Sequence, residues 1–309
     1  MSDLPDGDVP TAPEGEAFRS GFVGLAGRPN VGKSTLTNAL CRDHVAIVSD
    51  KPQTTRRRVL GVVHAPGAQL VLADLPGFQR PRDALTEKMQ RAVDESLADV
   101  DALLLVLDAR DEPGPGDRFI ASRVLSGTRP AVIALNKVDG MTPAKIAERI
   151  SQVARLGDFH ALHPVSAITG DGVDALRDEL LALLPQGPPY FPEEARTDQP
   201  ASFRIAELIR ERALALTREE VPHALAVSVD ELLPPRGGRA GRVRAVIAVE
   251  TESQQRMLIG KGGAMVKAIG RSSRPGIERL MGGPIYLDLT VKVRRGWRAD
   301  ASLIDRLGA

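Results

Sequence analysis

The sequence predicts two domains: an α/β domain with a mostly parallel, doubly wound sheet, and after it a smaller α+β domain. The length of 309 residues is about twice that of a typical domain. Up to about residue 185, continuous apolar runs alternate with helical patterns, which is typical of strands buried on both faces of a parallel sheet. A proline-rich break follows, and beyond it the order of the predicted elements changes.

The α/β domain is predicted to span residues 20–185. Four apolar runs of strand length lie in it, at Gly21–Leu25, Gln69–Ala73, Ala102–Asp108 and Ala131–Asn136. Helical patterns follow or separate these runs, at Ser34–Cys41, Ala84–Leu97, Ala144–Arg155 and Val173–Leu184. This alternation of strand and helix indicates the doubly wound sheet.

A linker is predicted at residues 186–200, because Gln186–Pro192 holds three prolines and a glycine in seven residues. The second domain, residues 201–309, is predicted to begin with a helix and to end with a strand. Its elements are expected at Ser202–Thr217 (helix), Ala224–Glu231 and Arg242–Glu250 (strands), Thr251–Leu258 and Ala264–Gly270 (helices), and Ile285–Arg294 (strand).

Composition excludes several classes of protein. A single cysteine, Cys41, excludes an internal disulfide, and no apolar run approaches the roughly 20 residues that span a bilayer. Residues 1–19 are acidic and lack both a basic start and an apolar run, so we expect a disordered tail and no signal peptide. Residues 191–309 hold 20 Lys and Arg against 15 Asp and Glu, while residues 1–190 hold 21 against 25. The second domain is therefore the basic half, which hints at an anionic partner.

The run Gly27-Arg-Pro-Asn-Val-Gly-Lys-Ser34 fits the P-loop pattern, and it lies between a predicted strand and a predicted helix, as that motif requires. Its backbone N–H groups and the start of the helix would hold phosphates. Lys33 should reach the β- and γ-phosphates, and the Ser34 hydroxyl should bind Mg²⁺. The predicted nucleotide-binding residues here are Gly27, Arg28, Pro29, Asn30, Val31, Gly32, Lys33, Ser34 and Thr35.

A second phosphate-side motif is Asp74-Leu75-Pro76-Gly77 at the end of a buried strand. The Asp74 carboxylate can hold Mg²⁺ through water, and the Gly77 N–H can meet the γ-phosphate. Alone this pattern is weak, but it gains strength from its place after the P-loop.

The run Asn136-Lys137-Val-Asp139 predicts a guanine site. Asp139 can accept hydrogen bonds from N1–H and the exocyclic amine of guanine, and adenine offers neither donor, so such a site rejects the wrong base by about 10⁴-fold or more. Ser166 and Ala167 would complete the pocket through a backbone N–H to the base oxygen.

The second domain carries Ile259-Gly-Lys-Gly-Gly263 between two predicted short helices, a loop of the kind that clamps about four nucleotides by their backbone. The predicted RNA-binding residues are Ile259, Gly260, Lys261, Gly262, Gly263, Arg256, Lys267 and Arg271. Aromatic residues make up only 3% of the chain, so base stacking should not dominate binding. Arg236-Gly-Gly-Arg239 is expected to be a solvated hairpin loop that could also touch RNA.

Taken together, these motifs resemble the Era family of GTPases with a type II KH domain. The resemblance rests on Gly27-Arg-Pro-Asn-Val-Gly-Lys-Ser-Thr-Leu36, Lys51-Pro-Gln-Thr-Thr-Arg56, Ile259–Ala264 and Val291–Arg298. It implies hydrolysis of GTP to GDP and phosphate with Mg²⁺, and binding near the 3′ end of 16S ribosomal RNA during 30S subunit assembly, as a nucleotide-controlled switch. It also implies a monomer in the cytoplasm, with peripheral association at the cytoplasmic face of the membrane.

The resemblance assigns catalytic roles to Lys33, Thr55, Gly77 and Asn30. Thr55 matches the threonine that contacts Mg²⁺ and the γ-phosphate, although Thr54 is an alternative because the two stand together. Phe78 follows Gly77 where other GTPases place a water-orienting glutamine. Some relatives use a potassium ion, held by the asparagine that matches Asn30, so we expect slow turnover that depends on positioning and charge.

Two rival functions fit parts of the sequence. A tRNA-modifying GTPase is disfavoured, because such relatives carry a cysteine near the C-terminal end and this chain has only Cys41. A module that binds GTP without cleaving it stays open at this point because of Phe78.

Overall fold

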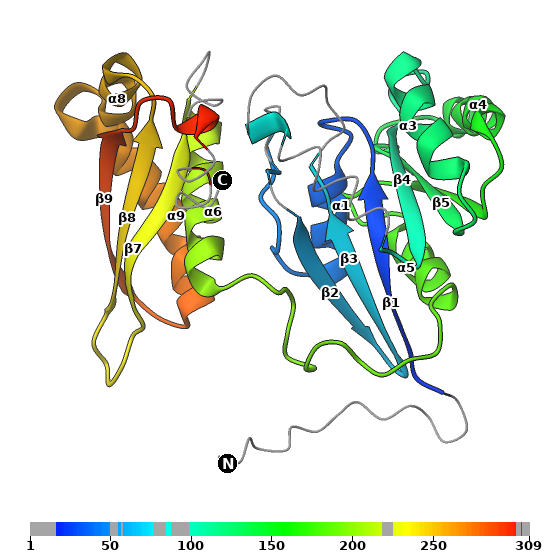
Figure 1. Cartoon of the computed structure of the whole chain (residues 1–309), viewed down its shortest axis with the longest axis horizontal. Helices are drawn as coiled ribbons and strands as arrows, with labels where there is room; N and C mark the ends of the chain where they lie inside the picture. Colours follow the sequence, from blue (N-terminus) through cyan, green and yellow to red (C-terminus); the bar gives the residue numbers. More distant parts are fainter. Residues whose placement is uncertain are drawn as a thin grey trace. The chain divides into compact units, whose positions relative to one another are not determined.

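The computed structural model describes residues 17–49, 55–56, 58–76, 85–87, 99–217, 225–300 and 304 (Figure 1). By contacts, the chain divides into two compact units. The first holds the described residues 17–46, 58–76 and 99–198. The second holds 47–49, 55–56, 85–87, 199–217, 225–300 and 304, so it is discontinuous in sequence. Residues 1–16 of the expected tail, and all of the predicted helix Ala84–Leu97 except 85–87, lie outside the described residues.

A six-stranded sheet forms the centre of the first unit, with the strand order β2-β3-β1-β4-β5-β6. The strands are β1 (Arg19–Ala26), β2 (Val59–Ala65), β3 (Ala68–Asp74), β4 (Ala102–Asp108), β5 (Ala131–Asn136) and β6 (Ala161–Val165). Among these described strands, only β2 runs antiparallel to its neighbour. The predicted mostly parallel α/β sheet is therefore confirmed.

Helices cover both faces of this sheet: α1 (Lys33–Cys41), α3 (Pro115–Leu125), α4 (Pro143–Val153) and α5 (Val173–Ala182), with a short 3-10 turn η1 (Ala154–Leu156). Strand β4 shows why its apolar run is continuous. Leu104 packs into the core shared with α1 and α5, whereas Leu103 and Leu105 pack into the core shared with α3. Each residue of a strand covered on both faces points into one core or the other, so the run from Ala102 to Leu107 is apolar throughout.

Strands β2 and β6 and helix α3 were not predicted. Both strands lie at the edges of the sheet. β6 contains Pro164, which lacks the N–H that a central strand needs, and β2 contains Gly61, which is poor in strand propensity. Helix α3 begins with Pro115-Gly116, a pair that usually indicates a turn, but proline is well suited to the first helical turn.

The predicted linker is hydrogen-bonded to the first unit over much of its length. The buried Gln69 side chain accepts hydrogen bonds from the N–H groups of Tyr190 (2.7 Å) and Phe191 (3.0 Å) and donates one to the Phe191 carbonyl (2.7 Å). The Val62 N–H donates to the Arg196 carbonyl (2.9 Å). Residues up to 198 therefore belong to the first unit, although three prolines leave them without regular structure.

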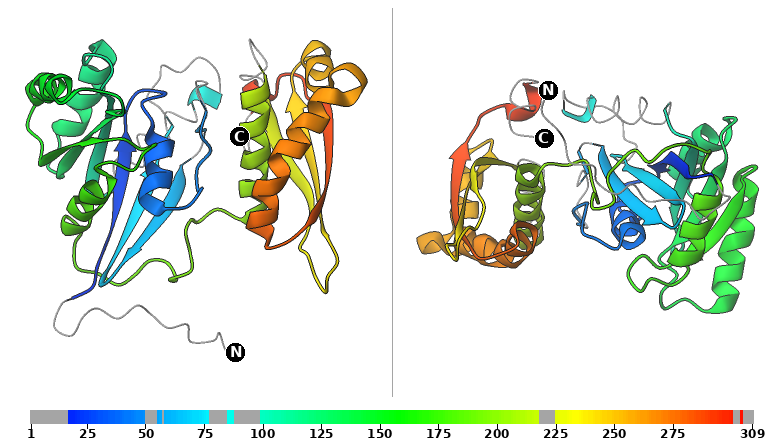
Figure 2. Two further views of the ribbon diagram at one scale, coloured as in Figure 1. Left: turned by 180° about the vertical axis from the view of Figure 1, so that it is seen from behind. Right: turned by 90° about the horizontal axis from the view of Figure 1, so that it is seen from below.

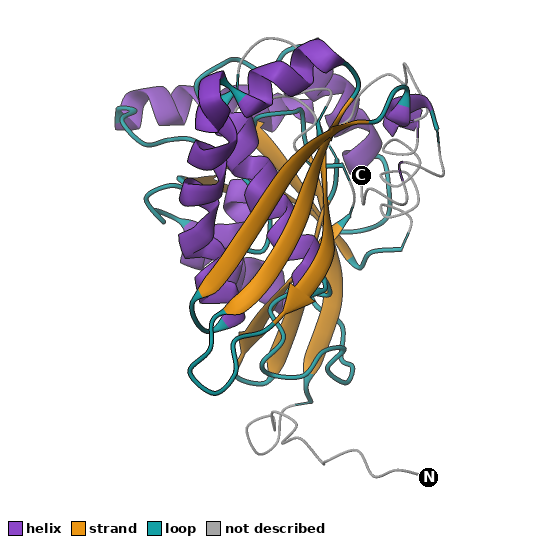
Figure 3. Ribbon diagram, turned by 90° about the vertical axis from the view of Figure 1, so that its left-hand side faces the viewer, coloured by secondary structure: helices purple, strands orange, loops and turns teal. Residues whose placement is uncertain are grey.

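The second unit is a three-stranded sheet with helices packed on one face (Figures 2 and 3). Its elements are α6 (Ala201–Leu216), β7 (Ala226–Leu233), β8 (Gly241–Val249), α8 (Glu252–Ile259), η2 (Lys261–Gly263), α9 (Ala264–Met281), β9 (Ile285–Val293) and η3 (Trp297–Ala299). In the sheet, β8 pairs antiparallel with β7 and parallel with β9. The predicted α+β domain, with the element order of a type II KH domain, is confirmed.

Helix α9 is longer than predicted. The prediction ended it at Gly270, because Gly270 and Pro275 both disfavour a helix interior, but it continues for 18 residues to Met281. Ile269, Ser273 and Ile277 recur every four residues and are buried, so packing of this stripe against the core outweighs the weak local propensity. The helix ends at Gly282, whose φ of +70° suits the cap.

None of the helices in the described ranges is long and apolar enough to cross a membrane.

Candidate functional site

The P-loop connects the carboxyl end of β1 to α1, and its backbone is tightly curved. Gly27 has a φ of +156°, and a Cβ there would lie 2.5 Å from the Val106 carbonyl oxygen. Gly32 has a φ of +99°, and a Cβ there would lie 2.3 Å from the Asn136 side-chain nitrogen. Gly32 caps α1 without a side-chain hydrogen bond, so the first N–H groups of the helix point out of its end. Such an end binds an anion such as phosphate.

Lys33 lies inside this loop. Its side chain is almost fully buried, and Nζ donates to the carbonyl oxygens of Gly27 (3.2 Å) and Arg28 (3.1 Å). Burial lowers the pKa of the ammonium to about 8, and the nearby Asp74 carboxylate opposes that shift in part. Phosphate groups beside Lys33 would favour its charged form. The contact of Lys33 with the β- and γ-phosphates stays a prediction.

Ser34 and Asp74 lie together at the edge of the sheet. The Ser34 hydroxyl donates to Asp74 Oδ2 at 2.7 Å, and Asp74 is fully buried at the end of β3, beside β1. Mg²⁺ prefers oxygen ligands and is usually held by one or two protein groups plus phosphate oxygens, so this pair fits it. Leu75 and Pro76 follow Asp74; Gly77 and Phe78 lie outside the described residues, and their roles stay predictions.

The Asn136 side chain joins three segments of the candidate base pocket. It is 1% exposed, its Nδ2 donates to the Val31 carbonyl (2.9 Å), and its Oδ1 accepts from the Ala167 N–H (3.0 Å). The P-loop, the end of β5 and the loop after β6 are thus held at fixed spacing by one amide.

Asp139 is oriented by the loop after β6. The buried Ser166 hydroxyl donates to Asp139 Oδ1 at 2.8 Å and accepts from the Thr169 N–H at 3.2 Å. Asp139 itself is exposed, so its carboxylate is available at the mouth of the pocket. Next to Ala167, Ile168 is 77% exposed and offers an apolar surface that a purine ring could cover.

Asp108 belongs to this site, although in the sequence it is recognisable only as the end of a strand. Lys137, with a φ of +69°, donates from Nζ to Asp108 Oδ2 (2.8 Å) and to the Asn30 carbonyl. Arg110 makes a two-point hydrogen bond to the same carboxylate, at 3.0 and 2.7 Å. Burial alone would raise the pKa of Asp108, but the hydrogen bonds from Arg110 and Lys137 outweigh it and lower the pKa to about 2. Asp108 therefore holds Lys137 against the P-loop.

The loop Gly260–Gly263 in the second unit has the geometry of a backbone clamp. Gly260, Gly262 and Gly263 have φ values of +71°, +60° and +77°, and a Cβ on Gly260 would lie 2.9 Å from Met265. Lys267 Nζ donates to the Gly262 carbonyl at 3.4 Å. The predicted residues Ile259, Lys261 and Arg271 are exposed. At Gly260 only glycine allows this course without a clash, and the loop brings its backbone to the surface.

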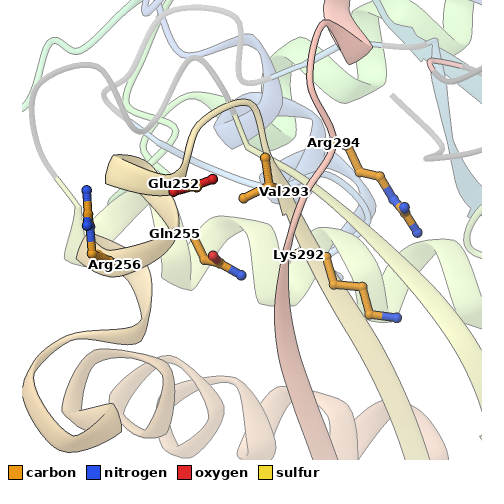
Figure 4. Close-up of a pocket in the computed structure, with 6 residues that line it drawn as sticks. All are labelled: Glu252, Gln255, Arg256, Lys292, Val293 and Arg294. Carbon is orange, nitrogen blue, oxygen red and sulfur yellow. The ribbon is translucent and has the colours of Figure 1, made fainter.

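A hollow of about 570 Å³ lies between α8 and the end of β9 (Figure 4). Gln255 Nε2 donates to the Val291 carbonyl at 2.8 Å and holds the helix to the strand. The rim of the hollow carries Arg256, which was predicted to bind RNA, and Lys292 and Arg294, which were not. The basic ending of the β9 sequence was the signal that could have indicated them.

Thr55 belongs to the second unit, whereas Ser34 and Asp74 belong to the first. The adjacent Arg56 is buried; its guanidinium donates to the Leu225 carbonyl at 2.8 Å and lies 5.3 Å from the centre of the Trp297 ring. The role of Thr55 in metal binding stays a prediction, and the alternative, Thr54, lies outside the described residues.

Known families match a segment of each unit of the chain. Residues 22–137 match a family described as 50S ribosome-binding GTPase, and residues 220–298 match the KH domain family. "GTPase Era" of Mycobacterium bovis (strain BCG / Pasteur 1173P2) is 46% identical over 298 residues, which is 94% of this chain and 99% of that relative. The chain belongs to the Era family of GTPases. "GTPase Era" of Heliobacterium modesticaldum is 43% identical over 95% of this chain and 98% of its own length.

Two solved Era structures cover nearly the whole chain. Era in complex with MgGDPNP and nucleotides 1506–1542 of 16S ribosomal RNA is 36% identical, covers 94% of this chain and 99% of its own, and has a TM-score of 0.89. A single-residue variant of Aquifex aeolicus Era bound to GDP.AlF4- is 35% identical with the same coverage and a TM-score of 0.90. As a member of the Era family, the chain is a GTP hydrolase, so the rival without hydrolysis is set aside.

Asp139→Asn should exchange guanine for xanthine specificity. An amide keeps one acceptor but places a donor where guanine also has a donor, whereas xanthine has an oxygen there. Loss of two hydrogen bonds to a charged group should weaken GTP binding by about 10² to 10⁴-fold. Competition binding with GTP, XTP and ATP measures this, with the exposed Asp158→Asn as control. An unchanged preference for GTP would refute the assignment.

Asp108→Asn should weaken GTP binding by about tenfold, because Lys137 loses a charged partner. It should also lower the free energy of unfolding at pH 7. The carboxylate has a pKa of about 2 in the folded chain and 3.8 without such partners, so its stabilisation is complete above about pH 4 and disappears as the pH falls toward 2. Urea unfolding of both proteins between pH 7 and 2 should show the difference narrowing; a constant difference would contradict this role.

Proposed function

We propose that this Era-family chain binds Mg²⁺ and GTP in its first unit and binds 16S ribosomal RNA near its 3′ end through its second. On this proposal, it acts as a nucleotide-controlled switch in assembly of the 30S subunit. The observation that carries the proposal is the match along 94% of the chain to an Era structure whose name includes both MgGDPNP and nucleotides 1506–1542 of 16S ribosomal RNA.

Side-chain geometry supports each half of the proposal. Ser34 with Asp74 fits Mg²⁺, and Asp139 with Ser166 fits guanine, while the glycine loop and the basic rim of the α8–β9 hollow fit RNA. The family description for residues 22–137 names the 50S subunit. That match covers only part of the first unit, so we give more weight to the relative that matches the RNA-binding half as well.

The placement of Arg56 supports the switch. Arg56 is hydrogen-bonded to Leu225 and packed on Trp297 in the second unit, and the residue before it, Thr55, is the predicted ligand of Mg²⁺ in the GTP state. Movement of Thr55 on nucleotide binding would therefore act directly on a buried contact of the KH unit. A ligand shifts such an equilibrium only by its difference in affinity for the two states.

The switch is tested by titrating the full chain with RNA that carries the 3′-terminal segment of 16S ribosomal RNA, in the GDP state and with a non-hydrolysable GTP analogue. A switch requires different RNA affinities in the two states, and RNA must change the affinity for the nucleotide by the same factor. Equal affinities would leave two independent binding units and would rule the switch out.

The rate of GTP hydrolysis is expected to depend on the monovalent cation. We propose that K⁺ assists hydrolysis at Asn30, so GTP turnover should be at least severalfold faster in potassium than in sodium at equal ionic strength. Because Asn30 has a φ of +65°, Asn30→Gly removes the side chain without backbone strain and should abolish the difference. Equal rates in the two salts for the unaltered chain would overturn this expectation.

RNA binding at the glycine loop is tested by charge. Lys261→Asp with Gly262→Asp should weaken RNA binding at least tenfold, because two carboxylates then face the RNA backbone. A Cβ on Gly262 meets nothing within 4 Å, and Asp and Asn both tolerate its φ of +60°. The neutral pair Lys261→Asn with Gly262→Asn is the matched control and should lose much less. Equal losses would assign the effect to shape and not to phosphate contact.

Other features of the proposal rest on the family resemblance. We propose the cytoplasm, where ribosomal subunits are assembled, as the site of action. Peripheral association with the membrane and the monomeric state stay predictions.

A further inference from the structure

The face of the three-stranded sheet that the helices leave open carries an exposed row of side chains. Leu233 of β7 lies opposite Arg242 of β8, which in turn lies beside Tyr286 of β9. Val243, the sequence neighbour of Arg242, packs into the helix-covered core, so Arg242 and the two residues paired with it point to the other face. Tyr286 is 70% exposed and Leu233 50% exposed. Exposure of an aromatic ring and an aliphatic side chain on either side of Arg242 calls for an explanation.

The charge of this row differs from that of the next row along the sheet. There, Arg244 is paired with Glu231 at 3.1 Å and with Asp288 at 3.6 Å, so its charge is compensated. Among the described residues, neither Arg242 in the exposed row nor Arg236 and Arg239 in the adjoining turn makes an ion pair. The end of the sheet with Tyr286 is therefore positively charged.

The turn holds two of these charges together. Arg236 and Arg239 exchange two backbone hydrogen bonds, at 3.2 and 3.0 Å, across Gly237 and Gly238. The two glycines have φ values of +56° and +75°, the signs of a tight type I′ turn. Two residues paired in this way have Cα atoms about 5.5 Å apart, and like charges in such a pair repel. An anion between the two guanidinium groups would relieve that repulsion.

We propose that Leu233, Arg236, Arg239, Arg242 and Tyr286, named the outer-face surface, form a second RNA-binding surface in addition to the glycine loop. The Tyr286 ring takes an unpaired base by stacking, and the arginines hold the flanking phosphates. The inference rests on the proposed function, because it assigns a further contact to the RNA that the KH unit binds.

The outer-face surface is separate from the glycine loop. Helix α9 begins directly after Gly263 and ends at Met281, four residues before β9, and its 18 residues make it about 27 Å long. The four nucleotides that a glycine loop clamps cannot extend over that length together with their own contacts. The surface therefore binds another part of a longer or folded RNA, and the two contacts together raise the overall affinity by holding each segment near its site.

RNA suits this surface better than a protein partner does. An apolar protein interface would need a contiguous apolar patch of several hundred Å². Of the five residues of the outer-face surface, only Leu233 and Tyr286 are apolar, and Arg242 lies between them. An aromatic face with uncompensated guanidinium groups is the chemistry that binds unpaired bases and phosphates.

The test uses the full chain and two RNAs: a short single strand that the glycine loop alone can hold, and the same strand extended by a hairpin. The double variant Arg242→Ser with Tyr286→Ser should bind the extended RNA about tenfold more weakly and should bind the short RNA as the unaltered chain does. Its affinity for the extended RNA should also depend less on salt, by about 0.7 in the logarithmic slope for each lost phosphate contact.

Two matched variants separate stacking from general charge. Tyr286→Phe keeps the ring and should bind the extended RNA normally. Arg279→Ser removes an exposed arginine from α9, on the helical side of the domain, and should also bind it normally. Crosslinking of the extended RNA, substituted with 4-thiouridine, should label β9 at Tyr286. Each altered side chain is exposed, and normal binding of the short RNA by the double variant verifies its fold.

The outcomes are distinct. If the unaltered chain does not bind the short RNA, the proposed function fails. If it binds the short RNA and the double variant binds the extended RNA equally well, the outer-face surface alone is overturned. If Arg279→Ser lost as much affinity for the extended RNA as the double variant, the effect would be one of net charge. The outer-face surface would then also be overturned. If the double variant bound RNA normally but no longer bound a polyglutamate peptide that the unaltered chain binds, the surface would be assigned to an acidic protein instead.

Discussion

The candidate nucleotide site depends on one buried amide. Asn136 bonds the Val31 carbonyl with its nitrogen and the Ala167 amide with its oxygen, so a single planar group sets the distance between the P-loop and both base-side loops. Gly32 allows this, since a Cβ there would collide with the same amide. A charged or apolar side chain could not replace Asn136, because one of the two buried partners would then be left without its hydrogen bond.

The parallel sheet supplies the rest of the geometry. Strands β1, β3, β4 and β5 end at the same edge, where the P-loop follows β1 and where β3, β4 and β5 end in Asp74, Asp108 and Asn136. Val31 and Asn136, which lie 105 positions apart in the chain, are therefore brought together by the sheet itself. Asp108 shows how the arrangement is refined, because its carboxylate fixes the lysine that contacts the P-loop.

Sequence reasoning predicted the strands at the centre of the first sheet and missed the two at its edges. The strands β1, β3, β4 and β5 read as continuous apolar runs because two cores cover them, whereas the edge strands β2 and β6 tolerate Gly61 and Pro164 and lose that signal. The end of α9 was misplaced, since the burial of Ile277 is decided by α6, a partner distant in sequence. Lys292 and Arg294 were missed for a similar reason: only the parallel pairing of β9 with β8 brings them beside α8.

The discontinuity of the second unit limits how the molecule can be taken apart. Ile47 is a member of the core formed by α6, β8 and α9, and Leu85 packs with Trp297 and Ala226. A gene fragment that starts after the proline-rich stretch would encode every strand of the KH fold but would lack Ile47 and Leu85. The apolar surfaces that these two side chains cover would then be exposed to water. Its poor solubility would then say nothing about the KH fold itself. For the same reason, recombination at the linker would separate the KH strands from Ile47 and Leu85, which complete their cores. The two halves of the gene are therefore expected to be inherited together.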